Sequence, residues 1–514
     1  MPEASDKQRE WAGWLTAALV MALGVWLRLP SMIHHDVAWS LYLTREYLAG
    51  ARLYVDLIEI NPPLIYWLMS PAVILANITG LSLSAAFKAY VFALGCLCMA
   101  TSAPLLARMQ SHRLRVVLPA VLAFTIAVLP RENFGQREHL LIILSMPWFL
   151  LAAARLEQTR ISAAGALIIA AMAGLGFYLK PHFLLAPALV EALLVARLGW
   201  RAMWRPEQVV LALLGAVYAG LVMWFTPDYL SRVVRYGMEV YQTGYGRTYL
   251  ATVMRQNLTL LLAVAAAFWW LTHRPVRTQA ATAVMAAAAA GLLGAYVAQS
   301  KGWAYHAYPM QAVLIVCIGV MLAGMMQAAT RNIAQKAATW FLLALLAANS
   351  ITPLQAPHYQ NGYVAAWSEE VAKRPQARSV LVMSANVYQG FPLVTQTGLT
   401  WASRFPCLWL TPGLKVRQGV EGNDNPMLAE IERYNRQAMF EDLDKHKPDL
   451  VFVDANEFKD HFGNVQYDYI EDFSHHDGFR RLWADYEKVG NRLGYDIYER
   501  RNTVGTLHLK PSLH

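Results

Sequence analysis

The stretch HHDVAWSLYLTREYLAGARLYVDLIEINPPLIY, residues 34–66, follows the first long apolar run of the chain and lies in a loop, residues 30–84, that is far longer than a turn. Long loops are commonly functional or disordered, and this one has the pattern of an ordered segment. Its apolar residues recur at helical spacing as far as Gly50, and a second helical pattern begins after Pro62 and Pro63. The sequence therefore predicts two helices that lie in the membrane interface.

The remainder of residues 1–351 consists mostly of apolar runs separated by short polar segments. A helix needs about 20 mostly apolar residues to cross a bilayer. Eleven runs are predicted to do so: residues 11–29, 85–107, 116–130, 139–154, 161–178, 182–197, 208–226, 257–272, 279–298, 309–328 and 336–351. The first run has no small-residue cleavage site after it and is interpreted as a retained span. The predicted fold is a polytopic α-helical membrane protein of about eleven transmembrane helices.

Charge divides the chain into two parts. Residues 1–350 hold 26 basic and 14 acidic side chains, whereas residues 351–514 hold 18 basic and 21 acidic ones. Only 15% of the chain is charged, against roughly a quarter in soluble domains. This pattern predicts a transmembrane domain over residues 1–351 and a soluble domain over residues 352–514, and it disfavours an ordinary cytosolic enzyme.

The soluble part has the pattern of a small α/β domain. Short apolar runs at residues 379–385 and 448–456 predict buried strands, residues 425–446 predict a helix between them, and YEKVGNRLGYDIYERR, residues 486–501, predicts a hairpin. The four cysteines of the chain do not form the pattern of a disulfide framework.

The basic side chains of the membrane part are concentrated in alternate loops. They are Lys7, Arg9, Arg108, Arg113, Arg115, Arg155, Arg160, Arg197, Arg201, Arg205, Arg274, Arg277, Arg331 and Lys336. Loops rich in Lys and Arg face the cytoplasm. With an odd number of spans in a bacterial inner membrane, the N-terminus is predicted to be cytoplasmic, whereas the loop of residues 30–84 and the domain of residues 352–514 are predicted to be periplasmic.

Acidic side chains are scarce between residues 11 and 350, and four of the eleven lie in the loop of residues 30–84: Asp36, Glu46, Asp56 and Glu59. Asp36 comes directly after the first span, with His34 and His35 before it. The end of a rigid helix thus places a carboxylate at the outer membrane surface, which makes Asp36 the first candidate for a functional residue. The alternative for each of these acids is a solvated loop residue or a helix cap.

The outer loops also carry cations that the orientation rule does not account for. The candidates are Arg131, Arg137, Lys180, His182, Arg232, Arg235, Lys301 and His306. Because Arg and Lys bind phosphate through charge-assisted hydrogen bonds, these residues are predicted to bind the phosphate of an anionic lipid. The alternative is that they snorkel or pair with nearby acids such as Glu132 and Glu138.

These features occur in a recognisable order: an acid just after the first span, a Tyr-rich amphipathic stretch reaching Gly50-Ala-Arg-Leu-Tyr54-Val-Asp56, then Asn61-Pro62-Pro63-Leu64-Ile65-Tyr66 and a long polytopic tail. Over about residues 11–240 the chain resembles the type C glycosyltransferase (GT-C) superfamily, and within it the branch of protein O-mannosyltransferases and lipid A aminoarabinose transferases. The resemblance implies an inverting enzyme that takes a sugar from a polyprenyl-phosphate carrier at the outer face. It also implies that Asp36 is the catalytic base or orients the acceptor.

The chain departs from this family at one place. Many members have adjacent Asp and Glu there, whereas Val37 follows Asp36 in this sequence. No metal ligands are therefore assigned from the motif, and a divalent ion such as Mg²⁺ or Mn²⁺ is left open. Asp56 and Glu59 are the candidates for a second carboxylate on the acceptor side.

The residue inventory suits this chemistry. Displacing a lipid phosphate from a sugar needs a base for the acceptor hydroxyl and cations for the departing phosphate. The chain contains neither a P-loop nor a Gly-x-Gly-x-x-Gly motif, so no nucleotide-sugar site is predicted, and no nucleic-acid partner is expected. The expected partners are a polyprenyl-phosphate-linked sugar, a glycan, lipid or protein acceptor, and the bilayer.

Two other functions are left open by the sequence. One is a lipid or polysaccharide transporter with a periplasmic domain, which is expected to have midplane charges and inverted repeats. Only Glu191 lies well inside a predicted span. The other is an oligosaccharide ligase that uses a pyrophosphate-linked donor.

Overall fold

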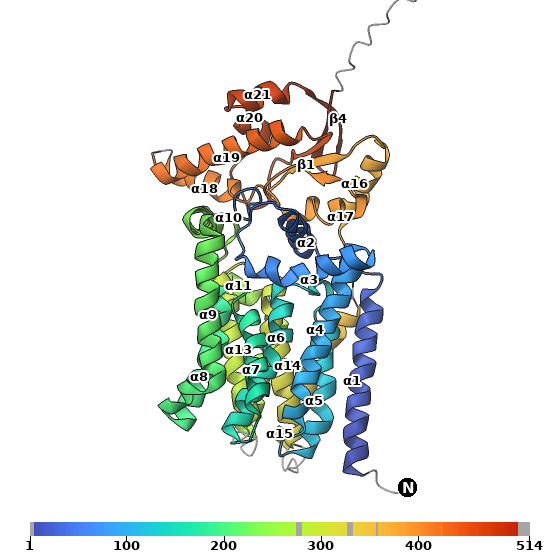
Figure 1. Ribbon diagram of the computed structural model, residues 1–514, viewed down its shortest axis with the longest axis vertical. Helices are drawn as coiled ribbons and strands as arrows, with labels where there is room; N and C mark the ends of the chain where they lie inside the picture. The colour runs from blue at the N-terminus through green and yellow to red at the C-terminus, as the bar shows by residue number, and fades with distance from the viewer. Residues whose placement is uncertain (1–4, 274–279, 326–332, 356–357, 423, 502–514) are drawn as a thin grey trace, which may run out of the picture. The chain divides into compact units, whose positions relative to one another are not determined.

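A computed structural model describes residues 5–273, 280–325, 333–355, 358–422 and 424–501 (Figure 1). The chain forms two compact units, each described by itself. The first, the helical unit, comprises Met1–Leu53, Asn61–Leu230 and Gly246–Gln360; the second, the sheet unit, comprises Tyr54–Ile60, Ser231–Tyr245 and Asn361–His514. Of the loop residues used to predict orientation, Arg274, Arg277 and Arg331 lie outside the described residues.

Each of the eleven apolar runs forms a helix. These helices are α1 (Asp6–Arg28), α4 (Leu83–Leu106), α5 (His112–Ala127), α6 (Arg137–Leu156), α7 (Ala163–Phe177), α8 (Leu185–Leu198), α9 (Pro206–Phe225), α12 (Asn257–Thr272), α13 (Ala280–Gln299), α14 (Ala304–Met325) and α15 (Ile333–Gln355). Among the described helices, seven are long and apolar enough to cross a membrane: α1, α4, α6, α8 with the preceding turn η2 (Pro181–Leu184), α9, α13 and α14. The predicted polytopic helical fold is confirmed.

The long first loop forms the two helices that its pattern predicts. They are α2 (His35–Leu48) and α3 (Leu64–Thr79), and they run across the end of the bundle, with α2 seen end-on in Figure 1. Helix α3 begins directly after Pro63 and ends at Gly80, whose φ of 72° is a left-handed conformation that glycine adopts without strain. Their position in the membrane interface stays a prediction.

Among the seven membrane-length helices that are described, α6 and α14 are the most enclosed. In each, 89% of the apolar window is buried inside the protein, whereas the value for α9 is 11%. Helix α6 packs against α4, α7, α13 and α14, while α9 exposes large side chains such as Leu213 and Trp224. Because successive spans alternate in direction, the ends of α1, α7 and α13 and the starts of α6 and α14 lie at one end of the bundle. Polar side chains at those helix ends therefore lie at the same end of the bundle.

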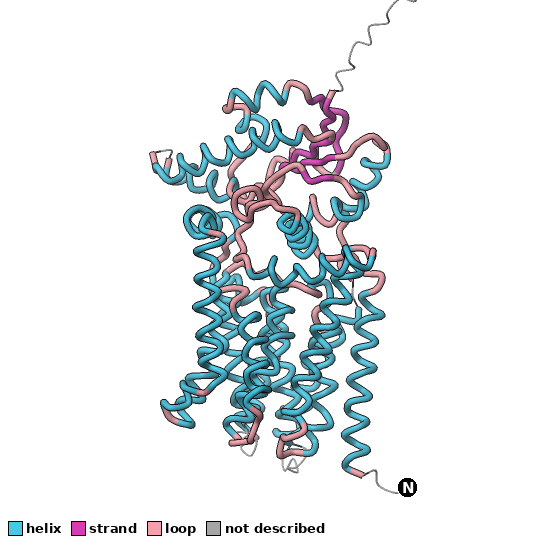
Figure 2. The backbone as a smooth tube through the Cα atoms, viewed as in Figure 1, coloured by secondary structure: helices cyan, strands magenta, loops and turns pink. Residues whose placement is uncertain are grey.

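The sheet unit contains five strands: β1 (Ser379–Met383), β2 (Thr400–Trp401), β3 (Leu450–Asp454), β4 (Tyr486–Arg492) and β5 (Tyr495–Arg500), magenta in Figure 2. Their order is β2-β1-β3-β5-β4, with β1 parallel to β2 and β3, and β5 antiparallel to β3 and β4. Helices α16 (Gly362–Ala372), α17 (Leu393–Thr397), α18 (Thr411–Glu421), α19 (Pro426–His446), α20 (Tyr469–Phe473) and α21 (Asp477–Trp483) complete the unit together with α10. Both predicted strands, the helix between them and the closing hairpin are confirmed.

Helix α10 (Arg235–Tyr245) comes from the middle of the membrane part of the sequence but packs within the sheet unit. It approaches α18 so closely that a Cβ on Gly413 would lie 1.7 Å from the carbonyl oxygen of Val240. The hydroxyl of Tyr245 donates a hydrogen bond to the carbonyl oxygen of Ala385 at 2.5 Å. The division into functional domains at residues 351 and 352 stays a prediction.

Candidate functional site

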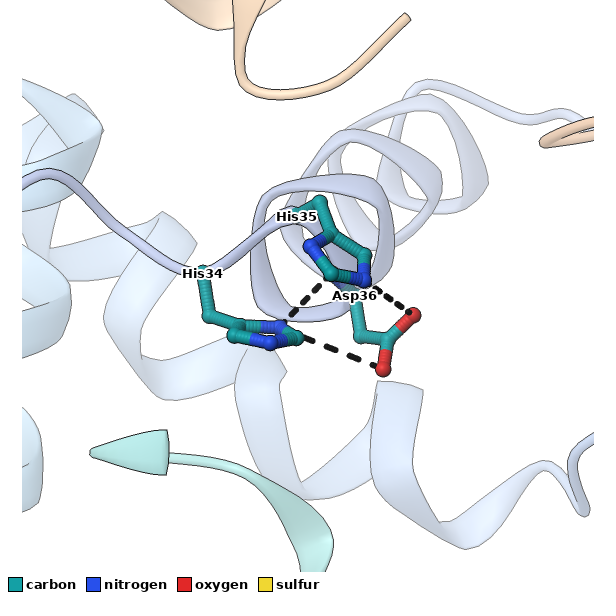
Figure 3. Close-up of side chains that lie close together, drawn as sticks. All are labelled: His34, His35 and Asp36. Atoms are coloured by element: carbon teal, nitrogen blue, oxygen red, sulfur yellow. Dashed lines mark hydrogen bonds and ion pairs between the residues drawn. The ribbon is translucent and has the colours of Figure 1, made fainter. Parts of the chain in front are cut away.

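The start of helix α2 brings together His34, His35 and Asp36 (Figure 3). His34 is the N-cap residue, and its Nδ1 accepts hydrogen bonds from the backbone N–H of Asp36 at 3.3 Å and from Nε2 of Gln136 at 2.7 Å. A ring nitrogen that accepts hydrogen bonds carries no proton, so His34 is a neutral imidazole with its proton on Nε2. Burial, the largest influence, also lowers the pKa of His34 and of His35.

The Asp36 carboxylate is held by the start of helix α6. Its Oδ2 accepts a hydrogen bond from Nε2 of Gln136 at 3.2 Å and lies 3.9 Å from Nη2 of Arg137. Burial opposes ionisation, but His35, His34, Arg137 and the Gln136 hydrogen bond together lower the pKa of Asp36 below its usual range. Of these neighbours, Arg137 is the one whose side chain is a permanent cation. The side chain is 18% exposed, so an ionised carboxylate remains accessible to a ligand.

His35 is held by a residue distant in the sequence. Its Nδ1 lies 2.7 Å from the hydroxyl of Tyr359, and the Tyr359 ring lies 4.8 Å from the His34 ring, centroid to centroid. The backbone N–H of Tyr359 donates to the hydroxyl of Ser31 at 3.4 Å. These contacts orient both imidazoles around the carboxylate.

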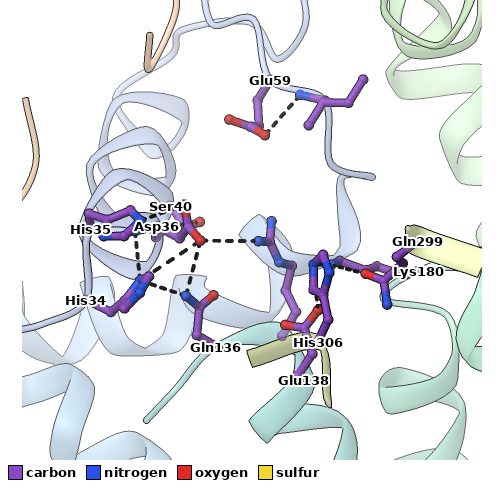
Figure 4. Close-up of polar contacts among 12 residues, drawn as sticks. His34, His35, Asp36, Ser40, Glu59, Gln136, Glu138, Lys180, Gln299 and His306 are labelled. Carbon is purple, nitrogen blue, oxygen red and sulfur yellow. Dashed lines mark hydrogen bonds and ion pairs between the residues drawn. The ribbon is translucent and has the colours of Figure 1, made fainter. Parts of the chain in front are cut away.

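A second polar cluster surrounds Lys180, at the turn between α7 and η2 (Figure 4). Its Nζ lies 2.6 Å from Oε1 of Glu138, 3.1 Å from Oε1 of Gln299 and 3.4 Å from Nε2 of His306. The Glu138 side chain is completely buried and the Lys180 side chain is 8% exposed. Burial lowers the pKa of Lys180 to about 8, although the Glu138 charge opposes this shift.

The two clusters are contiguous through the start of α6. Gln136 and Arg137 contact Asp36, while the next residue, Glu138, contacts Lys180. Tyr305 lies beside both clusters, with its ring centroid 6.1 Å from that of His34 and 5.8 Å from Nζ of Lys180. The result is a row of alternating charges, carboxylate, guanidinium, carboxylate and ammonium, at one end of the bundle.

The turn before α6 is built to present these side chains. Gly135 has a φ of 79°, and a Cβ there would lie 2.4 Å from the Phe87 ring, so only glycine fits. His139 braces the turn, because its Nδ1 accepts from the backbone N–H of Gly135 at 2.9 Å and its Nε2 donates to the carbonyl oxygen of Ile126 at 2.7 Å. In the sequence this segment reads PRENFGQREH.

Of the candidates predicted from the sequence, the structure brings together Asp36, Arg137, Lys180 and His306. His182 follows Lys180 in η2, and burial lowers the pKa of Lys301, just before α14, to about 7. Arg131 lines a small cavity that His34 also borders.

The other four candidates lie in the sheet unit: Asp56, Glu59, Arg232 and Arg235. Oε1 of Glu59 accepts the backbone N–H of Ile60 at 3.0 Å. Arg235 pairs with Glu430 at 2.8 Å, and the Arg232 guanidinium lies 5.5 Å from the centroid of the Tyr434 ring. Their roles toward a donor or acceptor stay predictions.

Sequence reasoning missed the amides and the tyrosine that connect the site: Gln136, Gln299 and Tyr359. It treated Glu138 only as an acid that an outer-loop cation could pair with. The signal in the sequence was position, because Gln299 directly follows a predicted span and Gln136 lies just before one.

The spacing of His34, His35 and Asp36 also meets the requirement for a metal site, since one ligand atom from each lies within 4.8 Å of the others. Two imidazole nitrogens and one carboxylate suit zinc or iron better than Mg²⁺. The His34 Nδ1 lone pair is already engaged by two hydrogen-bond donors, so a ligand role for that atom requires it to release Gln136. A site for Mg²⁺ or Mn²⁺ stays an open prediction.

No family model and no curated protein matches this chain. Two crystal structures of ArnT from Cupriavidus metallidurans match it over almost the full length. The structure bound to undecaprenyl phosphate is 14% identical, covers 94% of this chain and 96% of that chain, and superposes with a TM-score of 0.53. The apo structure is 13% identical, covers 95% and 97%, and has a TM-score of 0.54. The protein therefore has the fold of ArnT, which agrees with the fold that the resemblance in its sequence implied.

Proposed function

We propose that this protein is an inverting membrane glycosyltransferase that moves a sugar from a polyprenyl-phosphate carrier to a glycan, lipid or protein of the cell envelope. The observation that carries the proposal is the ionised, accessible Asp36 beside Arg137, with Lys180 in the adjoining cluster. The fold adds support, since one of the ArnT structures is bound to undecaprenyl phosphate.

Each group has a role in this reaction. The acceptor hydroxyl attacks the anomeric carbon of the sugar, and its proton passes to the Asp36 carboxylate. The bond between that carbon and the phosphate oxygen breaks, and the electron pair remains on the phosphate. Arg137 and Lys180 stabilise the added negative charge, as preorganised cations do where charge develops. A single displacement inverts the configuration at the anomeric carbon.

The test is turnover of defined donors by the purified protein in lipid nanodiscs. The donor is a sugar linked to a polyprenyl monophosphate, and the acceptor is supplied as an extract of the cell envelope. We expect polyprenyl phosphate to be released only when this extract is present. Release from pyrophosphate-linked donors alone would replace the proposal with an oligosaccharide ligase. Movement of the lipid across a vesicle membrane without any release would replace it with a transporter.

The proposed membrane orientation can be tested by cysteine labelling. Of the described cysteines, only Cys96 is exposed, so it is first replaced with Ser. Val420 is 83% exposed in the sheet unit and Ile333 is 85% exposed at the start of α15. We expect a membrane-impermeant thiol reagent to label Val420→Cys in intact spheroplasts and to label Ile333→Cys only after lysis. Labelling of Ile333→Cys but not of Val420→Cys from outside would reverse the orientation.

Binding of the carrier phosphate is expected to weaken as the pH rises through about 8, because the buried Lys180 loses its charge there. The phosphate monoester changes charge near pH 6 instead, so the two transitions are separable. Measuring the dissociation constant of undecaprenyl phosphate on both sides of pH 8 checks this. In Lys180→Arg the guanidinium keeps its charge, and the weakening should disappear. An equal decline in Lys180→Arg would assign the transition to another group.

A further inference from the structure

In the cluster around Lys180, the Glu138 carboxylate already binds the ammonium group that a phosphate would need. An ammonium group has three N–H donors and no more. All three are engaged, by Oε1 of Glu138 at 2.6 Å, Oε1 of Gln299 at 3.1 Å and Nε2 of His306 at 3.4 Å. Lys180 therefore cannot bind a phosphate oxygen unless one of these three contacts is given up.

The three partners of Lys180 differ in charge, and so in how strongly they compete with a phosphate. Gln299 and the imidazole of His306 are uncharged acceptors, whereas the Glu138 carboxylate is an anion in the closest contact. A phosphate oxygen bound to the Lys180 ammonium would share that group with the Glu138 carboxylate, so the two anions would lie close together. Two anions that contact the same buried cation repel each other.

The charges of the site balance without a ligand. Among the described contacts, the cations Arg137 and Lys180 lie against the carboxylates Asp36 and Glu138. A phosphodiester donor adds one negative charge, and the carrier phosphate that leaves the reaction carries up to two. An anion therefore enters a site whose cations already have partners. This arrangement limits how tightly the carrier phosphate is held.

The cluster nevertheless has capacity left for a ligand. His306 accepts from Lys180 through Nε2, which places its proton on Nδ1, and this buried atom has no hydrogen-bond partner among the described residues. The second oxygen of Glu138, Oε2, is likewise buried without a partner in the described part of the chain. Buried polar atoms without partners are rare and usually mark a place where a ligand or water belongs.

We propose that Glu138 is a positioning residue that competes with the carrier phosphate for Lys180 and so sets the affinity of the site. With no lipid bound, Glu138 keeps the buried ammonium paired; when the phosphate arrives, Lys180 exchanges the carboxylate for it. After transfer, Glu138 reclaims Lys180 and promotes release of the carrier. This inference rests on the proposed function, because it requires a lipid phosphate at Lys180.

The arrangement of groups around Glu138 limits the explanations for any effect. The charged or titratable side chains that the described contacts place against Glu138 are Lys180, at the N-cap position of η2, and His306 from α14, while Arg137 precedes Glu138 in α6. None of these is a second carboxylate. Neutralising Glu138 therefore removes the only carboxylate that the described hydrogen bonds place on Lys180.

The test uses two isosteric substitutions of opposite sign, with undecaprenyl phosphate as the probe in nanodiscs. Glu138→Gln removes the competing charge and is expected to tighten binding about tenfold, the scale of one charge-assisted hydrogen bond. Gln299→Glu places a second carboxylate at Lys180 and is expected to weaken binding by a similar factor. A tighter complex is a result that structural damage does not produce. We also expect Glu138→Gln to turn over more slowly at saturating donor, because carrier release is slower.

The control is Glu191→Gln, which breaks another ion pair of the same unit, with Arg205 at 2.6 Å, and should leave binding unchanged. Equal or weaker binding in Glu138→Gln overturns the inference. If that variant does not fold, unchanged binding in Gln299→Glu overturns it. The proposed function fails in a different way, namely if the wild-type protein itself does not bind undecaprenyl phosphate.

Discussion

Replacing Asp36 with Asn is expected to reduce sugar transfer by about 10²- to 10⁴-fold, the usual contribution of a positioned acid–base group. The amide keeps the size of the side chain and cannot accept the acceptor proton. The Asp36 carboxylate accepts a hydrogen bond from Gln136, which an amide oxygen can also accept. The protein should therefore fold, and it should still bind undecaprenyl phosphate. The measurement is the single-turnover rate with a saturating polyprenyl-phosphate-linked sugar.

A matched control is available on the same helix. Glu46 lies in α2 and pairs with Arg45 at 3.0 Å on an exposed surface. Such surface pairs contribute little, so Glu46→Gln should transfer sugar at the wild-type rate. A near wild-type rate in Asp36→Asn would place the base elsewhere, and Asp56 and Glu59 are then the next acids to replace.

Neutralising the pair Lys180 and Glu138 together is expected to abolish measurable binding of the carrier phosphate. Lys180→Met alone leaves the completely buried Glu138 without its cation, which costs about 3–5 kcal/mol of folding free energy. The double variant Lys180→Met, Glu138→Gln removes both charges and should stay folded. Because no ammonium remains for the phosphate, its dissociation constant for undecaprenyl phosphate should rise beyond the measurable range.

The control for the double variant neutralises a different ion pair of the helical unit. Arg205 and Glu191 are 2.6 Å apart and have no part in the proposed site. The variant Arg205→Met, Glu191→Gln should bind the lipid as the wild type does. Wild-type binding by Lys180→Met, Glu138→Gln would show that another cation, with Arg137 and Lys301 the first candidates, holds the phosphate.

Prediction from the sequence succeeded where the signal lies along the chain. A membrane span is an uninterrupted apolar run, so each of the eleven runs could be recognised, and each forms a helix. An acid that directly follows such a run stands out for the same reason, which is how Asp36 was identified. Strands β1 and β3 could be predicted because short apolar runs in the more highly charged C-terminal part of the chain are typical of buried strands.

Prediction missed what depends on packing. Helix α10 lies between predicted spans in the sequence, yet its contacts with α18 and Ala385 place it in the sheet unit. No local pattern shows this, because the partners are more than a hundred residues away. The partner of Glu138 was equally ambiguous, since the adjacent Arg137 is itself a cation. Adjacent residues on a helix point in different directions, and Glu138 contacts Lys180 instead.

The sequence by itself determined the helices, the strands and the carboxylate at the end of the first span, because each depends on neighbours along the chain. The tertiary structure alone decided which groups surround that carboxylate. Gln136 is 102 positions from His34, and Gln299 is 119 from Lys180. Such pairs form only when the start of α6 reaches the start of α2 and the end of α13 reaches the start of η2, and this depends on how the spans pack.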